Sequence, residues 1–427
     1  MDKSSFTIFH LTEDQAIAIL ETPSDQLEDA SDRYIAASRL VNFPSDRSIN
    51  ALIAAIQNNE PGLNNRIVRR KAVETLGYFK ASVALPIIRA CLGDEDTYTI
   101  ENAVWAIGEI GTQDESILEE IAQLLEKPKL NYRAIIHTLA KLEYKPALER
   151  IRKFTTSEDQ PISSAAIATV CRFTGDYTQM SRVVDLLQHS SVNARRSCIQ
   201  DLIDAKYYPA IPEIVKCCVS TVFRLRGIRS LAQVGIPSGK ITFADVEPHL
   251  EKAVWDHPDD LEFVHEYDQT PSLEFAINEL YETDFGRCYL ATKTLLDVYP
   301  DVAPAALMAN YAEKAYHDYG AHYHVIKLLG WFKYQPAYDL LVEALYNQEP
   351  QFKKSRTGAA IALGELGDKR AIPVLQANLE EANIWHLKYA CLMALDKFRV
   401  KWAMPTLHSL GAKDSDFLVQ AKAALLE

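Results

Sequence analysis

The sequence predicts an all-α protein, an α-solenoid of HEAT-like or armadillo-like helix pairs that repeat about every 31 residues. Three observations predict it: a core pattern recurs at a fixed spacing, a proline-led turn recurs in step with it, and strand signals are almost absent. One helix pair cannot bury its apolar face alone, so neighbouring pairs stack and share a core. Ordinary HEAT and armadillo repeats are longer, about 40–47 residues.

The recurring core pattern is A-x-x-x-[LI]-G, which begins at Ala72 and again 31 residues later at Ala103. The same step reaches Ala134 and Ala165, each of which opens an apolar run. Near the C-terminus, "AAIALG" and "ACLMAL" are also 31 residues apart. This spacing predicts helices that occupy the same place in successive repeats.

A short turn and a proline follow these helices, as in "YFKASVALPII", "KLEYKPALERI", "WFKYQPAYDLL" and "FRVKWAMPTL". Proline suits the first turn of a helix, where its missing N–H would have no partner. Six glycines lie near the expected helix ends, where we expect a left-handed backbone. These are Gly77, Gly108, Gly111, Gly330, Gly364 and Gly367.

The regularity of the repeats predicts four segments. Residues 1–59 form an N-terminal helical cap, in which Thr12 is an N-cap and Gln15 completes a capping box. Residues 60–234 form a first HEAT-like array and residues 286–427 a second. Residues 235–285 lose the period, are acidic and contain four prolines, so we expect an irregular joint. Degenerate repeats with longer loops explain this segment equally well.

The composition of the chain argues against several classes of function. The net charge is −13, with 45 basic and 58 acidic residues, which argues against nucleic acid as the main partner. Seven cysteines without a CxxC pair indicate reduced thiols in a cytosolic compartment. The N-terminus has no signal-peptide pattern, and no apolar run approaches the ~20 residues that span a bilayer. We therefore expect a soluble cytoplasmic protein without membrane insertion.

Familiar catalytic signatures are absent: the sequence has no nucleophile elbow, no Walker loop and no zincin motif. The only histidine cluster is "HDYGAHYH", with His317, His322 and His324. No carboxylate or thiol stands at ligand spacing on the same helix face, so we predict no metal site.

The second helix of each pair is expected to line the concave surface. In "YTIENAVWAIGEIG", helical spacing puts Tyr98, Glu101, Asn102, Trp105 and Glu109 on one face. The preceding repeat places there Ile67, Arg70, Lys71, Glu74 and Tyr78. The following repeat places there Lys129, Tyr132, Arg133, Ile136 and Ala140, with His137 and Lys141 beside them. In the second array the same face is expected to present Tyr289, Lys293, Asp297, Tyr323, His324, Lys327 and Trp331, and further along Arg356, Glu365, Lys388 and Tyr389.

The aligned faces of successive second helices form the predicted wall of the concave surface. Two interpretations of this wall remain open. A solvated face with salt bridges between repeats is the favoured explanation for any single charged residue, and packing between neighbouring repeats explains Trp105 as well as a ligand does. A ligand for the wall would be flat, conjugated and anionic, with N–H donors. An open-chain tetrapyrrole has these properties, and so does the surface of a partner protein.

The segments "NNRIVRRKAVETLG" and "DEDTYTIENAVWAIGEIG", together with the 31-residue repeat, resemble the E/F-type phycobilin lyases. These are HEAT-like bilin-attachment proteins of cyanobacteria and red-lineage plastids. The resemblance covers nearly the whole chain, and the cap "LTEDQAIAIL" is most similar to the branch that serves phycoerythrin α subunits.

The resemblance implies transfer of phycoerythrobilin to a cysteine of the apo-phycoerythrin α subunit through a thioether. The bilin would be a substrate, with no cofactor permanently bound, and the nucleophile would be the partner's thiolate. The expected location is the cyanobacterial cytosol, on the stromal side of the thylakoids. A second lyase or chaperone subunit, a lyase-isomerase activity and a non-catalytic scaffold or chaperone role all remain open.

Helix geometry then assigns candidate roles for this reaction. Glu101 and Glu109 are the expected catalytic carboxylates, which would contact pyrrole N–H groups. The expected ligand-binding residues are of three kinds: arginines for the propionates, aromatic rings that stack, and polar neighbours. They are Arg69, Arg70 and Arg133, then Trp105 and Tyr132, then Asn102 and His137.

Overall fold

The computed structural model describes residues 11–29, 31–58, 60–399, 409 and 413–426. Within these residues the chain is helical, and its one β feature is an isolated bridge between Cys217 and Glu262. The predicted all-α solenoid of HEAT-like helix pairs is confirmed. The chain forms two compact units, Met1–Thr178 (unit 1) and Gln179–Glu427 (unit 2).

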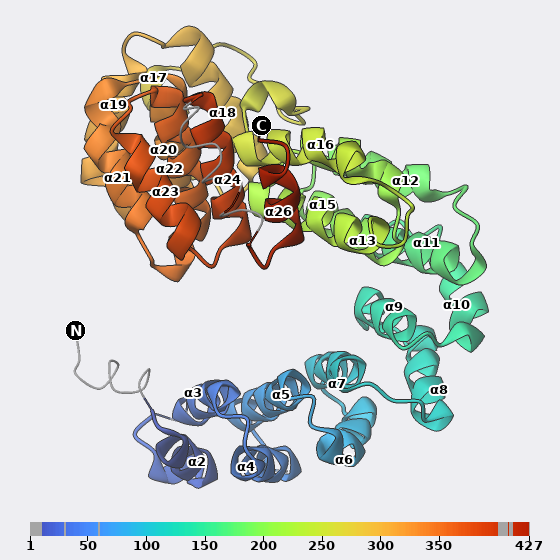
Figure 1. Cartoon of the computed structure of the whole chain (residues 1–427). Coiled ribbons are helices and arrows are strands. Elements are labelled where there is room, and N and C mark those ends of the chain that lie inside the picture. Colours follow the sequence, from blue (N-terminus) through green and yellow to red (C-terminus); the bar gives the residue numbers. More distant parts are fainter. Residues whose placement is uncertain (1–10, 30, 59, 400–408, 410–412, 427) are drawn as a thin grey trace. The chain divides into compact units, whose positions relative to one another are not determined.

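Unit 1 consists of two rows of helices (Figure 1). The first helices of the pairs, or A helices, are α2 (Glu13–Glu21), α4 (Asp46–Gln57), α6 (Leu85–Ala90), α8 (Glu115–Gln123) and α10 (Leu148–Arg152). The second, or B helices, are α3 (Asp32–Arg39), α5 (Leu63–Tyr78), α7 (Thr97–Ile110), α9 (Tyr132–Lys141) and α11 (Gln160–Thr174). Each A helix packs against the B helix that follows it, and successive B helices pack side by side.

Local sequence explains where these helices begin. Thr12 caps α2, and the capping box with Gln15 is present as predicted. Asp96 accepts the N–H of Thr99 at the start of α7, and Asn131 accepts the N–H of Ala134 at the start of α9. Pro86 stands in the first turn of α6 as predicted. Most of the expected last proline turn, "FRVKWAMPTL", lies outside the described residues.

The predicted left-handed glycines are confirmed at two of six positions. Gly111 and Gly367 have φ of 82° and 71°. Gly77, Gly108, Gly330 and Gly364 instead lie inside B helices or their equivalents, so the prediction is wrong for them. They face the next helix of the row, and their missing side chain lets the two backbones approach each other. The left-handed residues after the helices of Gly77 and Gly330 are Lys80 and Lys333. Glu143, Lys206 and Arg399 take the same conformation after other helices of the chain.

Unit 2 continues with helix pairs but is less regular. Its first helices are α12 (Met180–Asp185), α13 (Val192–Asp204), α14 (Ile211–Lys216), α15 (Thr221–Gly235), α16 (Phe243–Trp255) and α17 (Leu273–Glu279). The later ones are α18 (Phe285–Val298), α19 (Ala303–Glu313), α20 (Tyr319–Trp331), α21 (Tyr338–Tyr346), α22 (Lys353–Leu366), α23 (Ala371–Glu381), α24 (Trp385–Lys397) and α26 (Phe417–Ala423).

Short 3₁₀ turns connect many of these helices. In unit 1 they are Ser24–Gln26, Leu40–Asn42, Ser82–Ala84, Cys91–Gly93, Leu124–Glu126 and Lys145–Ala147. In unit 2 they are Leu186–Gln188, Tyr208–Ala210, Pro258–Asp260, Ala315–His317, Gln335–Ala337 and Pro350–Phe352. Several carry the proline of the repeated turn, as Pro146 and Pro336 do.

Within unit 2, α16 packs against α22 and α24, which follow it by more than 90 residues. The segment 235–285 therefore includes a regular helix, α16, and then a stretch without helix from Leu261 to Ser272. Along the chain, the boundary between the two compact units lies between Thr178 and Gln179, inside the segment expected as the first array. The four-part division by repeat regularity stays a prediction.

Candidate functional site

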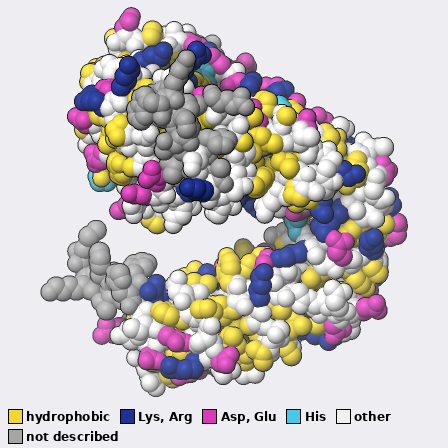
Figure 2. Space-filling model, viewed as in Figure 1, with side chains coloured by type: hydrophobic (Ala, Val, Ile, Leu, Met, Phe, Trp, Pro, Cys, Tyr) yellow, Lys and Arg dark blue, Asp and Glu magenta, His cyan; other side chains and the backbone are white. Residues whose placement is uncertain are grey.

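The residues predicted to form the site all belong to α5, α7 and α9, three neighbouring B helices of unit 1. Along the row of α3, α5 and α7, Figure 2 shows hydrophobic side chains interspersed with Lys and Arg. Tyr78 and Tyr98 are 57% and 60% exposed, and Tyr34 on α3 is 39% exposed. Exposed aromatic rings on adjacent helices are a feature of interaction surfaces.

Trp105 is half-buried and packs against the preceding repeat. Its ring lies 4.8 Å from the ring of Tyr78, at an interplanar angle of 63°. A Cβ atom added at Gly77 would stand 2.7 Å from the indole, so the ring covers this glycine. Contact with the neighbouring helix thus accounts for part of the indole surface, and a role in ligand binding stays a prediction for the part that faces water.

Glu101 and Asn102 connect α7 to its neighbours in the row. Glu101 accepts hydrogen bonds from Asn131, the N-cap of α9, and burial raises the pKa of its carboxyl group against the lowering effect of these bonds. The Nδ2 atom of Asn102 donates to the backbone carbonyl of Arg70 on α5 at 3.2 Å. A carboxyl with a raised pKa is suited to proton transfer near neutral pH.

Glu109, the second predicted catalytic carboxylate, forms an ion pair with Lys141 of α9 at 2.6 Å. Both side chains remain partly exposed, so the pair is screened by water and contributes little to stability. This is the salt bridge between repeats that the sequence left open as the alternative explanation for a single charge.

The three predicted arginines already have partners that join neighbouring segments. Arg69 donates to the carbonyl of Ile56 at 3.1 Å and to Asp94 at 2.8 Å. Arg70 makes two bonds of 2.6 Å to Asp96, and its guanidinium lies 4.6 Å from the ring centre of Tyr98. Arg133 donates to the carbonyl of Pro161 at 2.5 Å. These arginines bind protein groups in the structure described here.

In α9 the expected face is only partly present. The hydroxyl of Tyr132 donates to the carbonyl of Lys127 at 2.8 Å, and its ring lies 4.8 Å from that of Phe154, after α10. His137 is half-buried, whereas Ile136 and Ala140 are buried. The prediction that these last two face the wall is wrong, because they pack into the core of unit 1.

In unit 2 the expected wall is wrong for five residues. Tyr289, Tyr323, His324, Lys327 and Tyr389 are all buried. The other expected residues reach the surface: Asp297 is exposed, and the half-buried ones are Lys293, Trp331, Arg356, Glu365 and Lys388. The helices that carry the five buried residues, α18, α20 and α24, do not face open water at these positions because α16 and the turn after it pack there. At these five positions, a polar pattern typical of a solvated face lies in the interior of unit 2.

Asp256, just after α16, is the centre of a buried polar cluster in unit 2. Its carboxylate accepts hydrogen bonds from Tyr289 at 3.0 Å, from Tyr323 and from the guanidinium of Arg224. Lys327 donates to the carbonyl of Trp255, and burial lowers the pKa of this lysine to about 8. The sequence contains no local signal for the cluster, because its members come from α15, α16, α18 and α20.

Lys354 of unit 2 is a lysine buried among aromatic rings. It is buried, and its Nζ atom lies over three aromatic rings at 4.1 Å (Phe285), 4.6 Å (Tyr319) and 5.2 Å (Tyr323). The structure shows no ion pair or hydrogen bond for this ammonium within the described residues. Burial lowers the pKa of Lys354 to about 7.

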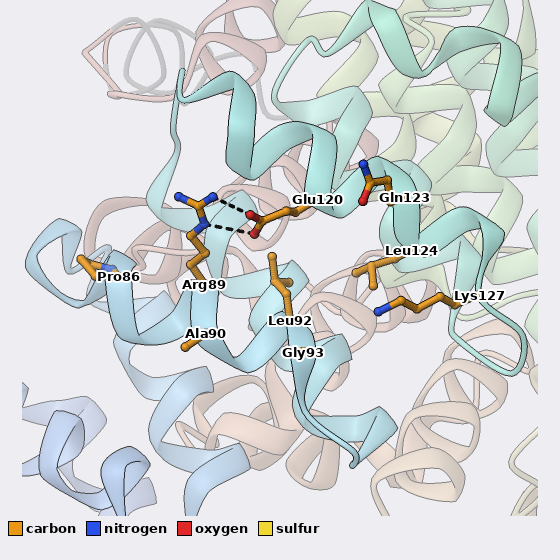
Figure 3. A pocket seen from close by; sticks show the side chains of 9 residues that line it. All are labelled: Pro86, Arg89, Ala90, Leu92, Gly93, Glu120, Gln123, Leu124 and Lys127. Carbon is orange, nitrogen blue, oxygen red and sulfur yellow. Dashed lines mark hydrogen bonds and ion pairs between the residues drawn. The ribbon is translucent and has the colours of Figure 1, made fainter.

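The exposed side of α3, α5 and α7 that carries Tyr34, Tyr78 and Tyr98 is the B-helix face. Three surface grooves are distinct from it. A groove of about 410 Å³ in unit 1 lies between the ends of α6 and α8, where Arg89 pairs with Glu120 (Figure 3). A second, of about 550 Å³, is lined by Glu60, Arg66, Arg69 and Asp94 among others. A third, of about 530 Å³ in unit 2, is lined by Tyr316, Tyr346, Phe352 and neighbouring acidic residues. Of the predicted site residues, Arg69 lines one of these three grooves.

Two further findings concern the described part of the chain. It contains no group of three or more His, Cys, Asp or Glu side chains placed to hold a metal ion. Nor does it contain a helix that is both long and apolar enough to cross a membrane.

Comparison with known proteins finds HEAT repeats and relatives named for bilin biosynthesis or a phycocyanin operon. The family model described as HEAT repeats matches residues 63–127 and 306–396. The "uncharacterized phycocyanin operon protein Y" of Pseudanabaena tenuis is 58% identical over 422 residues, which cover 99% of both chains. The "bilin biosynthesis protein CpeY" of a Synechococcus strain is 30% identical, over 92% of this chain and 97% of that protein.

A third relative has a shorter match. The "phycocyanobilin lyase subunit alpha" of Synechococcus elongatus is 30% identical over 236 residues, which cover 52% of this chain and 85% of the relative. Two of the three relatives thus align over almost their entire length, and their alignments include the helices of both units. The chain belongs to the E/F-type family of HEAT-repeat phycobilin lyases, in the branch of the bilin biosynthesis protein CpeY.

Proposed function

We propose that this chain attaches phycoerythrobilin through a thioether to a cysteine of the apo-phycoerythrin α subunit. Its membership of the family makes it a phycobilin lyase. The bilin and the acceptor are the proposed part. The observation that carries it is the B-helix face of unit 1, where exposed aromatic rings alternate with ionised groups of both signs.

The chain's own cysteines support an external nucleophile. All seven are buried free thiols. Burial raises the pKa of Cys171 to about 11, and that of Cys217, Cys218, Cys288 and Cys391 to about 12. The thiolate is the reactive form of cysteine, so these thiols stay unreactive near neutral pH. The sulfur that attacks the bilin then comes from the acceptor protein.

The reaction adds the S–H of the acceptor thiol across a carbon–carbon double bond of the bilin. The sulfur bonds to one carbon, the other carbon takes a proton, and the proton lost by the thiol returns to solvent. Protonation of a pyrrole nitrogen makes the bilin a better electrophile. Glu101 has a raised pKa and a place beside the aromatic rings of α7, so it is suited to holding or donating that proton.

A second lyase subunit is part of the proposal. One relative is named as a subunit, "phycocyanobilin lyase subunit alpha", and thus belongs to an assembly. We also place the protein in the cytoplasm, where the acceptor subunits are made. Phycoerythrobilin is treated as a substrate, and no permanently bound cofactor is proposed.

Another relative favours a second candidate acceptor. The protein that is 58% identical to this chain is named for a phycocyanin operon. A phycocyanin α subunit is therefore the alternative acceptor, with phycocyanobilin as the alternative bilin.

Co-expression tests these alternatives together. The chain is produced in a bacterium that makes one bilin and one apo-subunit, in each of the four combinations, and the subunit is analysed by mass spectrometry and absorption. We expect a covalent bilin on the phycoerythrin α subunit in the presence of phycoerythrobilin. Mutating the acceptor cysteines one at a time then identifies the attachment site.

The other outcomes are distinct. An adduct that absorbs further to the blue than attached phycoerythrobilin would indicate a lyase-isomerase, because moving a double bond shortens the conjugated system. No adduct in any combination, with the apo-subunit still bound by the purified chain, would support a non-catalytic scaffold or chaperone instead. The same assay repeated with a candidate second subunit decides whether one is required.

A further inference from the structure

The cations near the B-helix face of unit 1 differ in how freely they can accept a new anion. Arg70 is held by two short bonds to Asp96, and that carboxylate also caps α7 through Thr99. A ligand that removed Arg70 from Asp96 would disturb the start of the helix. Arg69 donates to Asp94 and to the carbonyl of Ile56, and Arg133 donates to the carbonyl of Pro161, so a new anion would have to displace bonds that join neighbouring segments.

Lys71 on α5 is different. Its Nζ atom lies 2.8 Å from Glu74, one turn along the same helix, and both side chains reach solvent, with 20% and 30% of their surface exposed. Such a pair on one helix is weak because water screens it. The Nζ atom of Lys71 also lies 5.6 Å from the ring centre of Tyr34 on α3.

The surroundings of this pair suit a flat ligand. Tyr34 on one side and Tyr78 on the other are both exposed, and Tyr78 is one helical turn after Glu74. Tyr78 in turn contacts Trp105. The pair is thus bordered by aromatic rings that could cover one face of a conjugated molecule.

We infer that Lys71 and Glu74 are the charged pair that binds the open-chain tetrapyrrole. Lys71 binds a propionate of the bilin, and Glu74 accepts hydrogen bonds from pyrrole N–H groups, while Tyr34 and Tyr78 contact the conjugated rings. When the ligand binds, Lys71 and Glu74 separate. Lys71 then pairs with the propionate, and Glu74 accepts hydrogen bonds from the pyrrole N–H groups. No charge is left unpaired, and no helix cap is lost. The inference rests on the proposed function.

Chemically blocking the propionates tests this directly. The purified full-length chain is titrated with phycoerythrobilin and with its dimethyl ester, and binding is followed by the change in bilin absorption. The variants are Lys71→Met, Lys71→Arg and Glu74→Gln. The control is Lys153→Met, an exposed lysine of unit 1 that follows α10 and so belongs to the row of A helices.

We expect Lys71→Met to weaken binding of the free acid about tenfold, as the loss of one charge-assisted hydrogen bond implies. Binding of the dimethyl ester should be the same for this variant and the wild type. Lys71→Arg should restore most of the affinity for the free acid. Glu74→Gln should weaken both ligands alike, and Lys153→Met neither.

The contrary results are equally clear. If Lys71→Met weakens the acid and the ester equally, or weakens neither while the melting temperature is unchanged, Lys71 does not bind a propionate and the inference is overturned. The proposed function has a separate test, since formation of the covalent adduct by the wild-type chain does not depend on which cation holds the propionate.

Discussion

The indole ring of Trp105 packs against Gly77 so closely that a Cβ atom at this glycine would stand 2.7 Å from the ring and 3.0 Å from the Cα of Ala106. The glycine thus determines how near α5 and α7 approach each other, and it positions the aromatic ring on the B-helix face. Replacing it changes both packing and the candidate site.

Gly77→Ala should destabilise the protein even though alanine favours helix. The gain in helix propensity is about 1 kcal/mol, whereas overpacking against a backbone atom that cannot move away costs about 1–3 kcal/mol. Urea denaturation followed by circular dichroism should show a lower midpoint. Gly93→Ala is the matched control, because no atom lies within 4 Å of the added Cβ there. Equal midpoints for the two variants would show that the contact tolerates a methyl group.

Trp105→Ala should reduce bilin transfer more than it reduces stability. The substitution removes the contact with Tyr78 but leaves the buried core residues of α7 in place. We expect the rate of adduct formation to fall at least tenfold while the melting temperature falls by only a few degrees. Trp105→Phe should retain part of the rate. A large loss of stability with unchanged bilin affinity would assign Trp105 to packing between repeats alone.

Asp256→Asn should be far more damaging than an ordinary surface substitution. It leaves the buried guanidinium of Arg224 without its counter-charge, and breaking one partner of a buried pair costs about 3–5 kcal/mol. Tyr289→Phe removes a hydrogen bond to the same carboxylate and should cost about 1 kcal/mol. Asp260→Asn, in a more exposed pair with Lys252, should change stability little. The measurement is the free energy of unfolding in urea, and the order of the three variants is the critical result.

Lys354→Met should stabilise the protein at pH 7. The pKa of Lys354 is about 7 in the folded chain against 10.5 for an ordinary lysine. As the pH falls from 10.5 to 7, the unfolded chain takes up this proton and the folded chain does not, so the free energy of unfolding falls over that range. Below pH 7 the penalty is fully present. Replacing buried ion pairs by apolar side chains stabilises by about 1–4 kcal/mol in known cases, and we expect a gain of this order here.

The pH dependence separates this effect from general repacking. The difference in unfolding free energy between Lys354→Met and the wild type should shrink as the pH rises from 7 towards 10.5. Lys353→Met, at the exposed neighbouring position, should show no such trend. A difference that stays constant over this range would mean that Lys354 keeps an ordinary pKa.

Much of the fold could be predicted because it depends on short-range patterns. The capping box of Thr12 and Gln15 and the first-turn Pro86 are local signals, and the structure confirms them. The 31-residue spacing that aligns Ala72, Ala103 and Ala165 places all three in the core, because helical periodicity determines which face is apolar. These assignments require no knowledge of contacts between segments that are distant in the sequence.

The site was harder to predict because it depends on contacts between distant segments. Lys327 and Tyr323 have the spacing of a solvated face on α20, but the chain end of α16 covers them. For the arginines of unit 1, the sequence gives charge but not partner. Arg70 is bound to Asp96, 26 residues later, and only the folded repeat shows that this bond is shared with a helix cap. The weaker pair of Lys71 and Glu74 differs from it in partner and exposure, not in sequence pattern.

The helical glycines have a mechanical consequence. Gly77, Gly108, Gly330 and Gly364 sit where one helix of the row meets the next, and the first helices of the pairs, such as α4 and α6, touch far less than α5 and α7 do. Each repeat is therefore a wedge with its narrow edge at the glycine. A single methyl group at that edge would change the angle between adjacent wedges, and the change would add up along the row. Curvature in this family can thus evolve by substitution at one position per repeat, without any change in the core that holds each pair together.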